Sequence, residues 1–237
     1  MNCIVKDIKK TENYILLTVE TEKEILIEPG QFVMLKPKYY DFGKPFSVIF
    51  QEGKIIKFLI AVVGELTTEL KMLKENDELD IRGAYGIPFI NKIDKSKKYI
   101  LLGGDCGSAP LIHFSEKYPH LVDKKIYGYA TSEIRKIFNI KGLHIDEEEK
   151  MNLIEKLFKD IKFENNNAFL VCGSMDMIKS IKKAFSLYNV KIYASLEAIM
   201  GCGIGICKGC PVKTKNGIKM ICKDGPIFDL SEVNLEW

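Results

Sequence analysis

The first 94 residues alternate short apolar runs with turn residues, which is the pattern of β-strands. Several short strands separated by glycine- and proline-containing turns are typical of an antiparallel barrel or sandwich. One helix is expected over residues 67–74, because Leu66, Leu70 and Leu73 recur at helical spacing. The expected strands cover residues 14–19, 24–27, 31–35, 46–50, 55–63 and 78–81.

From about residue 95 the pattern changes to strands that alternate with helices, which implies a parallel sheet with crossover helices. The expected strands are residues 99–102, 126–130, 168–172 and 191–194, and the expected helices are residues 109–116, 151–161 and 175–188. Residues from 195 onward are rich in glycine and cysteine. The predicted fold class is therefore α+β multidomain: an antiparallel β-barrel (1–94), an α/β parallel-sheet domain (95–195) and a small C-terminal domain (196–237).

The composition limits the classes of partner. Hydrophobic residues make up 46% of the 237, which is enough for a packed core. The net charge of +3 gives no electrostatic argument for a nucleic-acid partner. No run of eighteen apolar residues exists, and residues 1–10 lack the apolar core of a signal peptide, so we expect no membrane helix and a cytoplasmic protein. Seven cysteines in a reducing compartment then indicate ligands or buried thiols rather than disulfides.

Four of these cysteines lie close together near the C-terminus. Cys202, Cys207 and Cys210 have the spacing C-x4-C-x2-C, and Cys222 follows after a gap, which is the plant-type 2Fe–2S spacing. The glycines between them permit a tight loop around a cluster. A tetrahedral zinc site on the same thiolates is the alternative, although zinc ribbons usually pair two C-x2-C knuckles and this segment has one.

Two segments of the second domain could contact a nucleotide. Residues 103–110 join a strand to a helix through three glycines, and Pro110 suits the first helical turn. Such a loop either lets the backbone approach a phosphate or makes a tight turn with no ligand. Cys172 and Gly173 follow a strand at the sheet edge where open α/β sheets bind ligands, but a lone cysteine there is more often plain packing.

Two segments of the first domain are similarly ambiguous. Residues 44–47, with the sequence Lys-Pro-Phe-Ser, could hold a phosphate and a ring edge at a fixed separation. Gly64 and Thr67 open the expected helix, where N–H groups are available to an anion. From spacing alone, a turn and a helix cap explain both segments.

The order of these pieces resembles the electron-transfer subunits of NAD-dependent (class 1B) dihydroorotate dehydrogenases, which belong to the ferredoxin–NADP reductase superfamily. The resemblance covers essentially the whole chain. Its most specific parts are residues 195–197 (Ser-Leu-Glu), 200–210 around the first three clustered cysteines, and 222–228 (Cys-Lys-Asp-Gly-Pro-Ile-Phe). It implies an FAD domain, an NAD domain and a 2Fe–2S domain, in that order.

The resemblance also implies which residues contact each cofactor. For FAD they are Lys44, Pro45, Phe46, Ser47, Leu59, Ile60, Ala61, Gly64, Leu66 and Thr67. For NAD they are Gly103, Gly104, Gly107, Pro110, Cys172 and Gly173. For the cluster they are Cys202, Cys207, Cys210 and Cys222. No catalytic acid or base is required of this chain.

Four positions depart from the family pattern. Lys44 replaces an arginine, so a bidentate hold on pyrophosphate becomes a point charge. Leu66 and Asp105 replace glycines, and Ser174 replaces a proline.

The implied function is electron transfer between NAD and a catalytic dihydroorotate dehydrogenase subunit, through FAD and the cluster, in pyrimidine biosynthesis. The implied assembly is a heterotetramer of two copies of each subunit. Two alternatives keep the cluster: a reductase subunit of the sulfite reductase or ferredoxin–NADP oxidoreductase type, and a cluster-carrying protein that has lost nucleotide binding. Arg135 and Lys136 could meet the 2′-phosphate of NADP or could be solvated, and NAD is expected on the resemblance.

Overall fold

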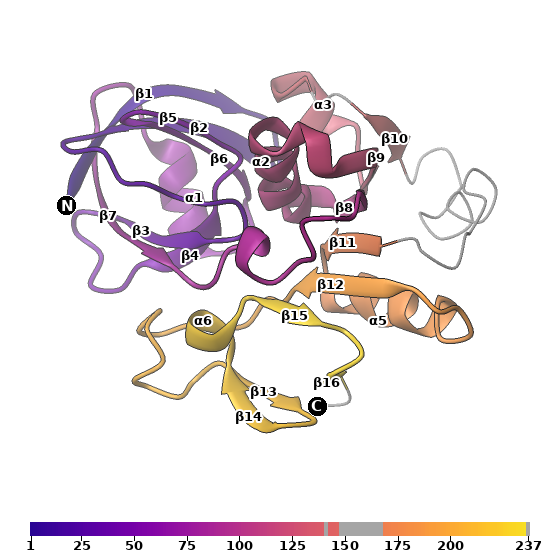
Figure 1. The fold of residues 1–237 in the computed structure, drawn as a ribbon. Helices are drawn as coiled ribbons and strands as arrows, with labels where there is room; N and C mark the ends of the chain where they lie inside the picture. The colour runs from indigo at the N-terminus through magenta and orange to yellow at the C-terminus, as the bar shows by residue number, and fades with distance from the viewer. Residues whose placement is uncertain (140–141, 147–167, 236–237) are drawn as a thin grey trace.

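The computed structural model describes residues 1–139, 142–146 and 168–235, which form three β-sheets with helices packed between them (Figure 1). The expected helix over residues 151–161 lies outside the described residues. The mixed α and β content and the antiparallel first sheet confirm the coarse prediction of fold class.

The first sheet contains seven strands in the order β4-β3-β7-β1-β2-β6-β5, and every neighbouring pair is antiparallel. Its strands are β1 (Asn2–Lys10), β2 (Tyr14–Thr21), β3 (Phe32–Pro37), β4 (Lys44–Ser47), β5 (Phe50–Glu52), β6 (Ile55–Ala61) and β7 (Glu78–Tyr85). The two edge strands, β4 and β5, are joined by only the buried Val48 and Ile49, so the sheet has to curl round on itself. Helix α1 (Glu65–Met72) buries Leu66 and Leu70 in the core of this sheet.

One strand of this region was missed, and one expected strand was wrong. Strand β1 was not predicted, although residues 2–10 alternate apolar and polar positions as a strand does. Residues 24–27 form no strand. Two of their backbone groups bond to one side chain instead: Gln51 Oε1 accepts from the N–H of Ile27 at 2.9 Å, and Gln51 Nε2 donates to the carbonyl of Ile25. A strand ladder is therefore unnecessary for these two groups.

The second sheet has the order β10-β9-β8-β11-β12-β15 and is parallel except for β15, as the alternating pattern predicted. Its strands are β8 (Tyr99–Gly104), β9 (Val122–Tyr129), β10 (Leu143–Asp146), β11 (Ala168–Cys172), β12 (Lys191–Ser195) and β15 (Ile227–Asp229). Its helices are α2 (Ala109–Lys117), α3 (Glu133–Ile137) and α5 (Met175–Ala184), with short 3-10 turns η1 (Phe89–Asn91), η2 (Asp105–Ser108) and η3 (Pro119–Leu121).

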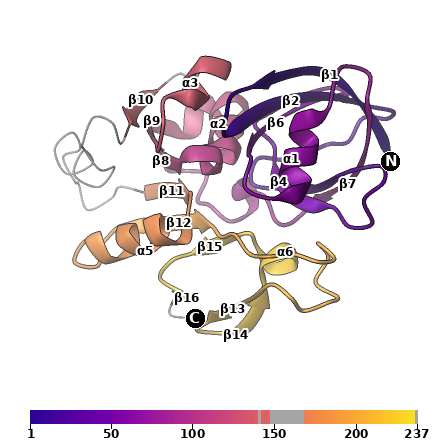
Figure 2. The same ribbon diagram turned by 180° about the vertical axis from the view of Figure 1, so that it is seen from behind.

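Helices cover both faces of this sheet (Figures 1 and 2). Alternate residues of each strand point to opposite faces. Leu101 and Leu170 accordingly belong to the core that contains α2, whereas Leu102 and Val171 belong to the core that contains α5.

The C-terminal segment forms a small third sheet, β14-β13-β16, and also completes the second one. Its elements are β13 (Pro211–Thr214), β14 (Gly217–Met220), α6 (Ile221–Asp224) and β16 (Val233–Asn234). Residues 196–226 leave β12 and return as β15, which pairs with β12 itself. The N–H of Leu196 donates to the carbonyl of Pro226 at 2.9 Å, so this excursion is closed at its base. Among the described residues, no helix combines the length and the apolar character needed to span a bilayer.

Candidate functional site

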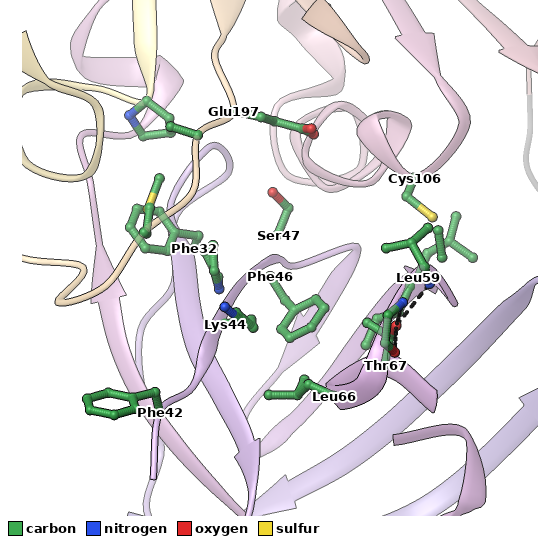
Figure 3. A pocket seen from close by; sticks show the side chains of 18 of the residues that line it. Phe32, Phe42, Lys44, Phe46, Ser47, Leu59, Leu66, Thr67, Cys106 and Glu197 are labelled. Atoms are coloured by element: carbon green, nitrogen blue, oxygen red, sulfur yellow. Dashed lines mark hydrogen bonds between the residues drawn. The ribbon is translucent and has the colours of Figure 1, made fainter. Parts of the chain in front are cut away.

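A pocket of about 800 Å³ opens where the first sheet, the second sheet and the segment after β12 meet (Figure 3). All ten residues predicted to contact FAD line this pocket, and so does Cys172 from the predicted NAD set. Sites of this volume with mostly apolar walls and a few polar groups are typical of small-molecule and cofactor binding.

Thirteen other lining residues were not predicted. They are Phe32, Tyr40, Asp41, Phe42, Val63, Glu65, Cys106, Ser195, Leu196, Glu197, Ala198, Met200 and Pro226. Five of them, Ser195, Leu196, Glu197, Met200 and Pro226, lie within the segments that carry the family resemblance, so a signal for them was present. The others depend on which loops meet in three dimensions.

The entry to α1 is organised by one threonine. The Thr67 hydroxyl accepts from the N–H groups of Val63 and Gly64, at 2.9 and 3.0 Å, and donates to the carbonyl of Gly64 at 2.9 Å (Figure 3). The N–H groups of the first turn of α1, which starts at Glu65, have no hydrogen-bond acceptor within the helix. They lie at the same end of the helix as the Thr67 hydroxyl. A methyl group on Gly64 would meet nothing within 4 Å, so the backbone at this point is open to a ligand.

Two of the family departures have a structural explanation here. Leu66 is buried and packs into the core of the first sheet while forming part of the pocket wall. Lys44 is exposed on the pocket rim, where its ammonium group supplies positive charge without a fixed geometry.

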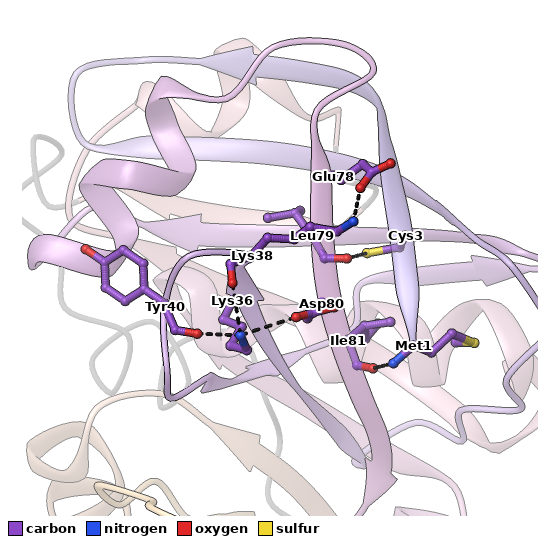
Figure 4. A network of polar contacts seen from close by, with 9 residues as sticks. All are labelled: Met1, Cys3, Lys36, Lys38, Tyr40, Glu78, Leu79, Asp80 and Ile81. Carbon is purple, nitrogen blue, oxygen red and sulfur yellow. Dashed lines mark hydrogen bonds and ion pairs between the residues drawn. The ribbon is translucent and has the colours of Figure 1, made fainter.

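A loop on one side of the pocket, residues 38–43, is held in place by polar contacts (Figure 4). Lys36 on β3 pairs with Asp80 on β7 at 3.2 Å and donates to the backbone carbonyl of Tyr40. At the far side of the loop, the Tyr39 hydroxyl donates to Glu69 of α1 at 2.6 Å. The loop therefore presents its pocket residues from a position fixed by both the sheet and the helix.

Two thiols and a carboxyl group from the second domain and the following segment line the same pocket (Figure 3). Burial raises the pKa of both the Cys106 and the Cys172 thiol well above the usual range, so both stay protonated near neutral pH. Glu197 is exposed as a residue, and loss of water around its carboxyl group raises its pKa. The two protonated thiols make this end of the pocket weakly polar.

The remaining predicted NAD residues do not line the pocket, and Gly103, Gly107 and Gly173 make close backbone contacts instead. A methyl group on Gly107 would lie 2.6 Å from the Cα of Gly173, and one on Gly103 would lie 2.8 Å from the Cα of Ser108. These glycines are required because two backbones touch. Pro110 is buried in the first turn of α2, as its sequence position predicted.

The backbone at Asp105 is left-handed, with φ of +45°, which explains why the family pattern has glycine at this position. Asp is among the few residues that tolerate this region. Its carboxylate accepts from the N–H of Ala130 at 2.9 Å and from the Tyr14 hydroxyl at 3.5 Å. Close by, Glu133 of α3 accepts from the backbone and side-chain nitrogens of Asn13 at 2.9 and 2.7 Å. These acidic groups link the second domain to the first sheet.

The four clustered cysteines come together as two pairs. Cys210 Sγ and Cys222 Sγ lie 3.2 Å apart, and both residues are buried. On the outer side, the N–H of Cys207 donates to Cys202 Sγ at 3.4 Å, and so does the N–H of Ile204. These two donors lower the pKa of Cys202 to about 6, whereas burial raises that of Cys222 to about 12.

The pairing bears on which metal group the loop suits. A single zinc ion is held by four ligands arranged around one point. Two thiol pairs instead match a group with two metal atoms, each held by two thiolates. Gly203 and Gly205, with φ of +76° and +82°, make the tight turns that bring the pairs together.

Comparison with solved structures defines the class of fold. The structure of an NADH-dependent reduced ferredoxin–NADP oxidoreductase superposes with a TM-score of 0.81 over 98% of this chain and 90% of that one, at 24% sequence identity. A ferredoxin–NADP⁺ reductase from Plasmodium falciparum superposes with a TM-score of 0.60 over 81% of this chain and 95% of that one, at 15% identity. The chain therefore has the ferredoxin–NADP reductase fold.

Comparison of sequences then identifies the family. The iron–sulfur cluster binding domain of dihydroorotate dehydrogenase B matches residues 197–234. The dihydroorotate dehydrogenase B (NAD(+)) electron transfer subunit of Clostridium perfringens is 31% identical over 97% of this chain and 96% of its own length. The probable electron transfer subunit of Methanocaldococcus jannaschii is 31% identical over 95% of this chain and 88% of its own. The chain belongs to the family of dihydroorotate dehydrogenase B electron-transfer subunits.

Proposed function

We propose that this chain transfers electrons between NAD and the catalytic subunit of a dihydroorotate dehydrogenase, in pyrimidine biosynthesis in the cytoplasm. The observation that carries the proposal is the convergence of all ten predicted FAD positions on one pocket, next to the family's cluster loop. The proposed division is an FAD domain over residues 1–94, an NAD domain over 95–195 and a 2Fe–2S domain over 196–237. The proposed assembly contains two copies of each subunit.

The pocket residues fit FAD by their chemistry. The open backbone at Gly64, the helix N–H groups beside it and the Lys44 ammonium suit a pyrophosphate. Apolar side chains such as Leu59 and Ile60 suit a ring system, and the Ser47 hydroxyl can hydrogen-bond its edge. When bound, FAD supplies the step between two-electron hydride exchange with NAD and one-electron exchange with the cluster.

The role of the protein groups is then to bind, orient and exclude water. The protonated thiols of Cys106 and Cys172 add no charge at the end of the pocket that adjoins the second sheet. The proposed cluster ligands are the pairs Cys202 with Cys207 and Cys210 with Cys222, one pair for each iron.

The test is the visible spectrum of anaerobically purified protein, with iron, sulfide and flavin assayed on the same sample. We expect about two irons and about one FAD per chain. Cys210→Ser should lose the iron and its absorption while keeping the flavin. Cys106→Ser, outside the four ligands, should keep the iron. Zinc without sulfide, or full iron content in Cys210→Ser, would overturn the cluster assignment.

The partner is tested by co-expression with a dihydroorotate dehydrogenase B catalytic subunit. A stable complex that reduces NAD⁺ with dihydroorotate is the expected result. The fold is shared with a ferredoxin–NADP oxidoreductase, which favours a reductase of that type as the second candidate. NADH oxidation by this chain with no complex formation would support that candidate.

A further inference from the structure

The crevice between the carboxyl ends of β8 and β11 lies at the topological switch point of the second sheet. The chain runs from β8 outward through β9 and β10 and then resumes at β11 on the other side of β8. Open α/β sheets bind ligands at this place. The crevice lies near the large pocket: Cys172, which lines that pocket, directly precedes Gly173, and Cys106, which also lines it, follows Gly104 by two residues.

The crevice is occupied by a side chain of the protein. A methyl group on Gly104 would lie 2.5 Å from Met177 Sδ, and a methyl group on Gly173 would lie 2.6 Å from the same sulfur. The thioether therefore rests on both glycines, one from each strand end. Met177 is half-buried, and it reaches the crevice from the first turn of α5.

The cap of α5 fixes the backbone of Met177, and its unbranched side chain packs against the core beside the crevice. Ser174 caps α5, and its hydroxyl accepts from the N–H of Met177 at 3.3 Å. Methionine has three rotatable side-chain bonds and no branch, so it can leave a gap that it fills. Because neither glycine has a side chain, the space below the sulfur becomes open backbone once the side chain turns away.

We propose that Met177 is a gate on the nicotinamide-nucleotide site, and that the nucleotide binds only when this side chain leaves the Gly104–Gly173 crevice. The inference rests on the proposed function, because it takes NAD as the ligand of the crevice. A protein whose binding-competent state is populated only in part shows an affinity reduced by that fraction. Met177 is thus a positioning residue that sets the nucleotide affinity and does not take part in hydride transfer.

The experiment uses the full chain with its FAD and cluster, and measures the Kd for NAD⁺ by calorimetry. Met177→Ala should lower the Kd about fivefold, which corresponds to a competent fraction of about 0.2 in the native protein. In NADH oxidation with ferricyanide, KM should fall by a similar factor while kcat stays unchanged. Met177→Leu, which keeps the bulk with less freedom to turn, should show no gain in affinity.

Met175→Ala is the matched control. Met175 is the same residue type on the same helix, half-buried against the same core as Met177, but the atoms nearest to a methyl group on either crevice glycine do not include it. It should lose a similar amount of stability and leave the Kd unchanged. An unchanged or weaker Kd in Met177→Ala, or an equal gain in Met175→Ala, overturns the gate while leaving the proposed function intact. If the native protein and every variant fail to bind NAD⁺, the proposed nucleotide function fails and the gate fails with it.

Discussion

The backbone contact between Gly107 and Gly173 predicts that the second domain tolerates no side chain at position 107. Gly107→Ala adds a single methyl group at a place where the nearest atoms are the Cα and N of Gly173, at 2.6 and 2.7 Å, and the carbonyl carbon of Cys172, at 2.9 Å. Ordinary van der Waals contact begins near 3.4 Å. All three atoms belong to the backbone, so no side chain can turn away to relieve the clash.

The expected cost follows from that geometry. Overpacking a filled site costs about 1–3 kcal/mol, and the upper part of this range applies because η2 and the end of β11 must separate. For a chain of this length, about 2–3 kcal/mol corresponds to a fall in Tm of about 4–12 °C. The same separation should raise KM for NADH and leave the FAD content unchanged, because Gly107 lies outside the pocket.

The assay is thermal unfolding of the FAD-free apoprotein followed by circular dichroism, with Gly64→Ala as the control, because loss of FAD binding cannot then change the Tm. Gly64 has extended backbone, with φ of −172°, and a methyl group there meets nothing within 4 Å. Its variant should therefore stay within about 0.5 kcal/mol of the native protein. Equal Tm values for Gly107→Ala and Gly64→Ala would refute the claim that backbone contact at Gly107 limits this position.

Three further predictions address the pocket and the contacts between domains. Gly64→Ala should weaken FAD binding about tenfold, or roughly 1.4 kcal/mol, because the added methyl group takes space that is open to the ligand. Flavin titration of the apoprotein measures this, and an unchanged Kd for FAD would remove Gly64 from the site. Hydrogen bonds from Thr11 and Asn13 lower the pKa of Glu133 to about 2 from an ordinary 4.5, so its contribution to stability is present above pH 4.5 and is lost as the pH falls towards 2. Glu133→Gln should therefore reduce the fall of Tm across that pH window. Parallel curves of Tm against pH for the native protein and the variant would contradict this. Asp105→Ala should leave a backbone N–H and a tyrosine hydroxyl without their acceptor and lower stability by about 1–3 kcal/mol in urea unfolding, whereas a neutral result would mean that water replaces the carboxylate.

Local pattern predicted most of the second sheet and the cysteine loop. A buried parallel strand such as β11 shows as a short apolar run, and the ligand spacing of Cys202, Cys207 and Cys210 is contained in nine residues of sequence. Both signals are local, so folding does not change them.

Other features depend on partners that are distant in sequence. Residues 24–27 have the composition of a strand, but Gln51 bonds to two of their backbone groups from elsewhere. Met177 has the pattern of an ordinary core position of an amphipathic helix, and only the sheet order brings it over Gly104. The departure at Asp105 is explained only by its backbone angle and by its donors, which the sequence alone does not show.

The return of the chain from the cysteine loop to β15 determines whether that loop can be separated from the rest of the protein. A redox centre on a flexible tether could be cut off, exchanged or attached to another reductase as a separate cassette. Here the loop begins and ends on two hydrogen-bonded neighbours, β12 and β15, so one cut near residue 195 would also remove an edge strand from the adjoining sheet. The separation between the loop and the large pocket is accordingly set by strand pairing. A designer who wished to transplant the cluster would have to move β12, the loop and β15 as one piece.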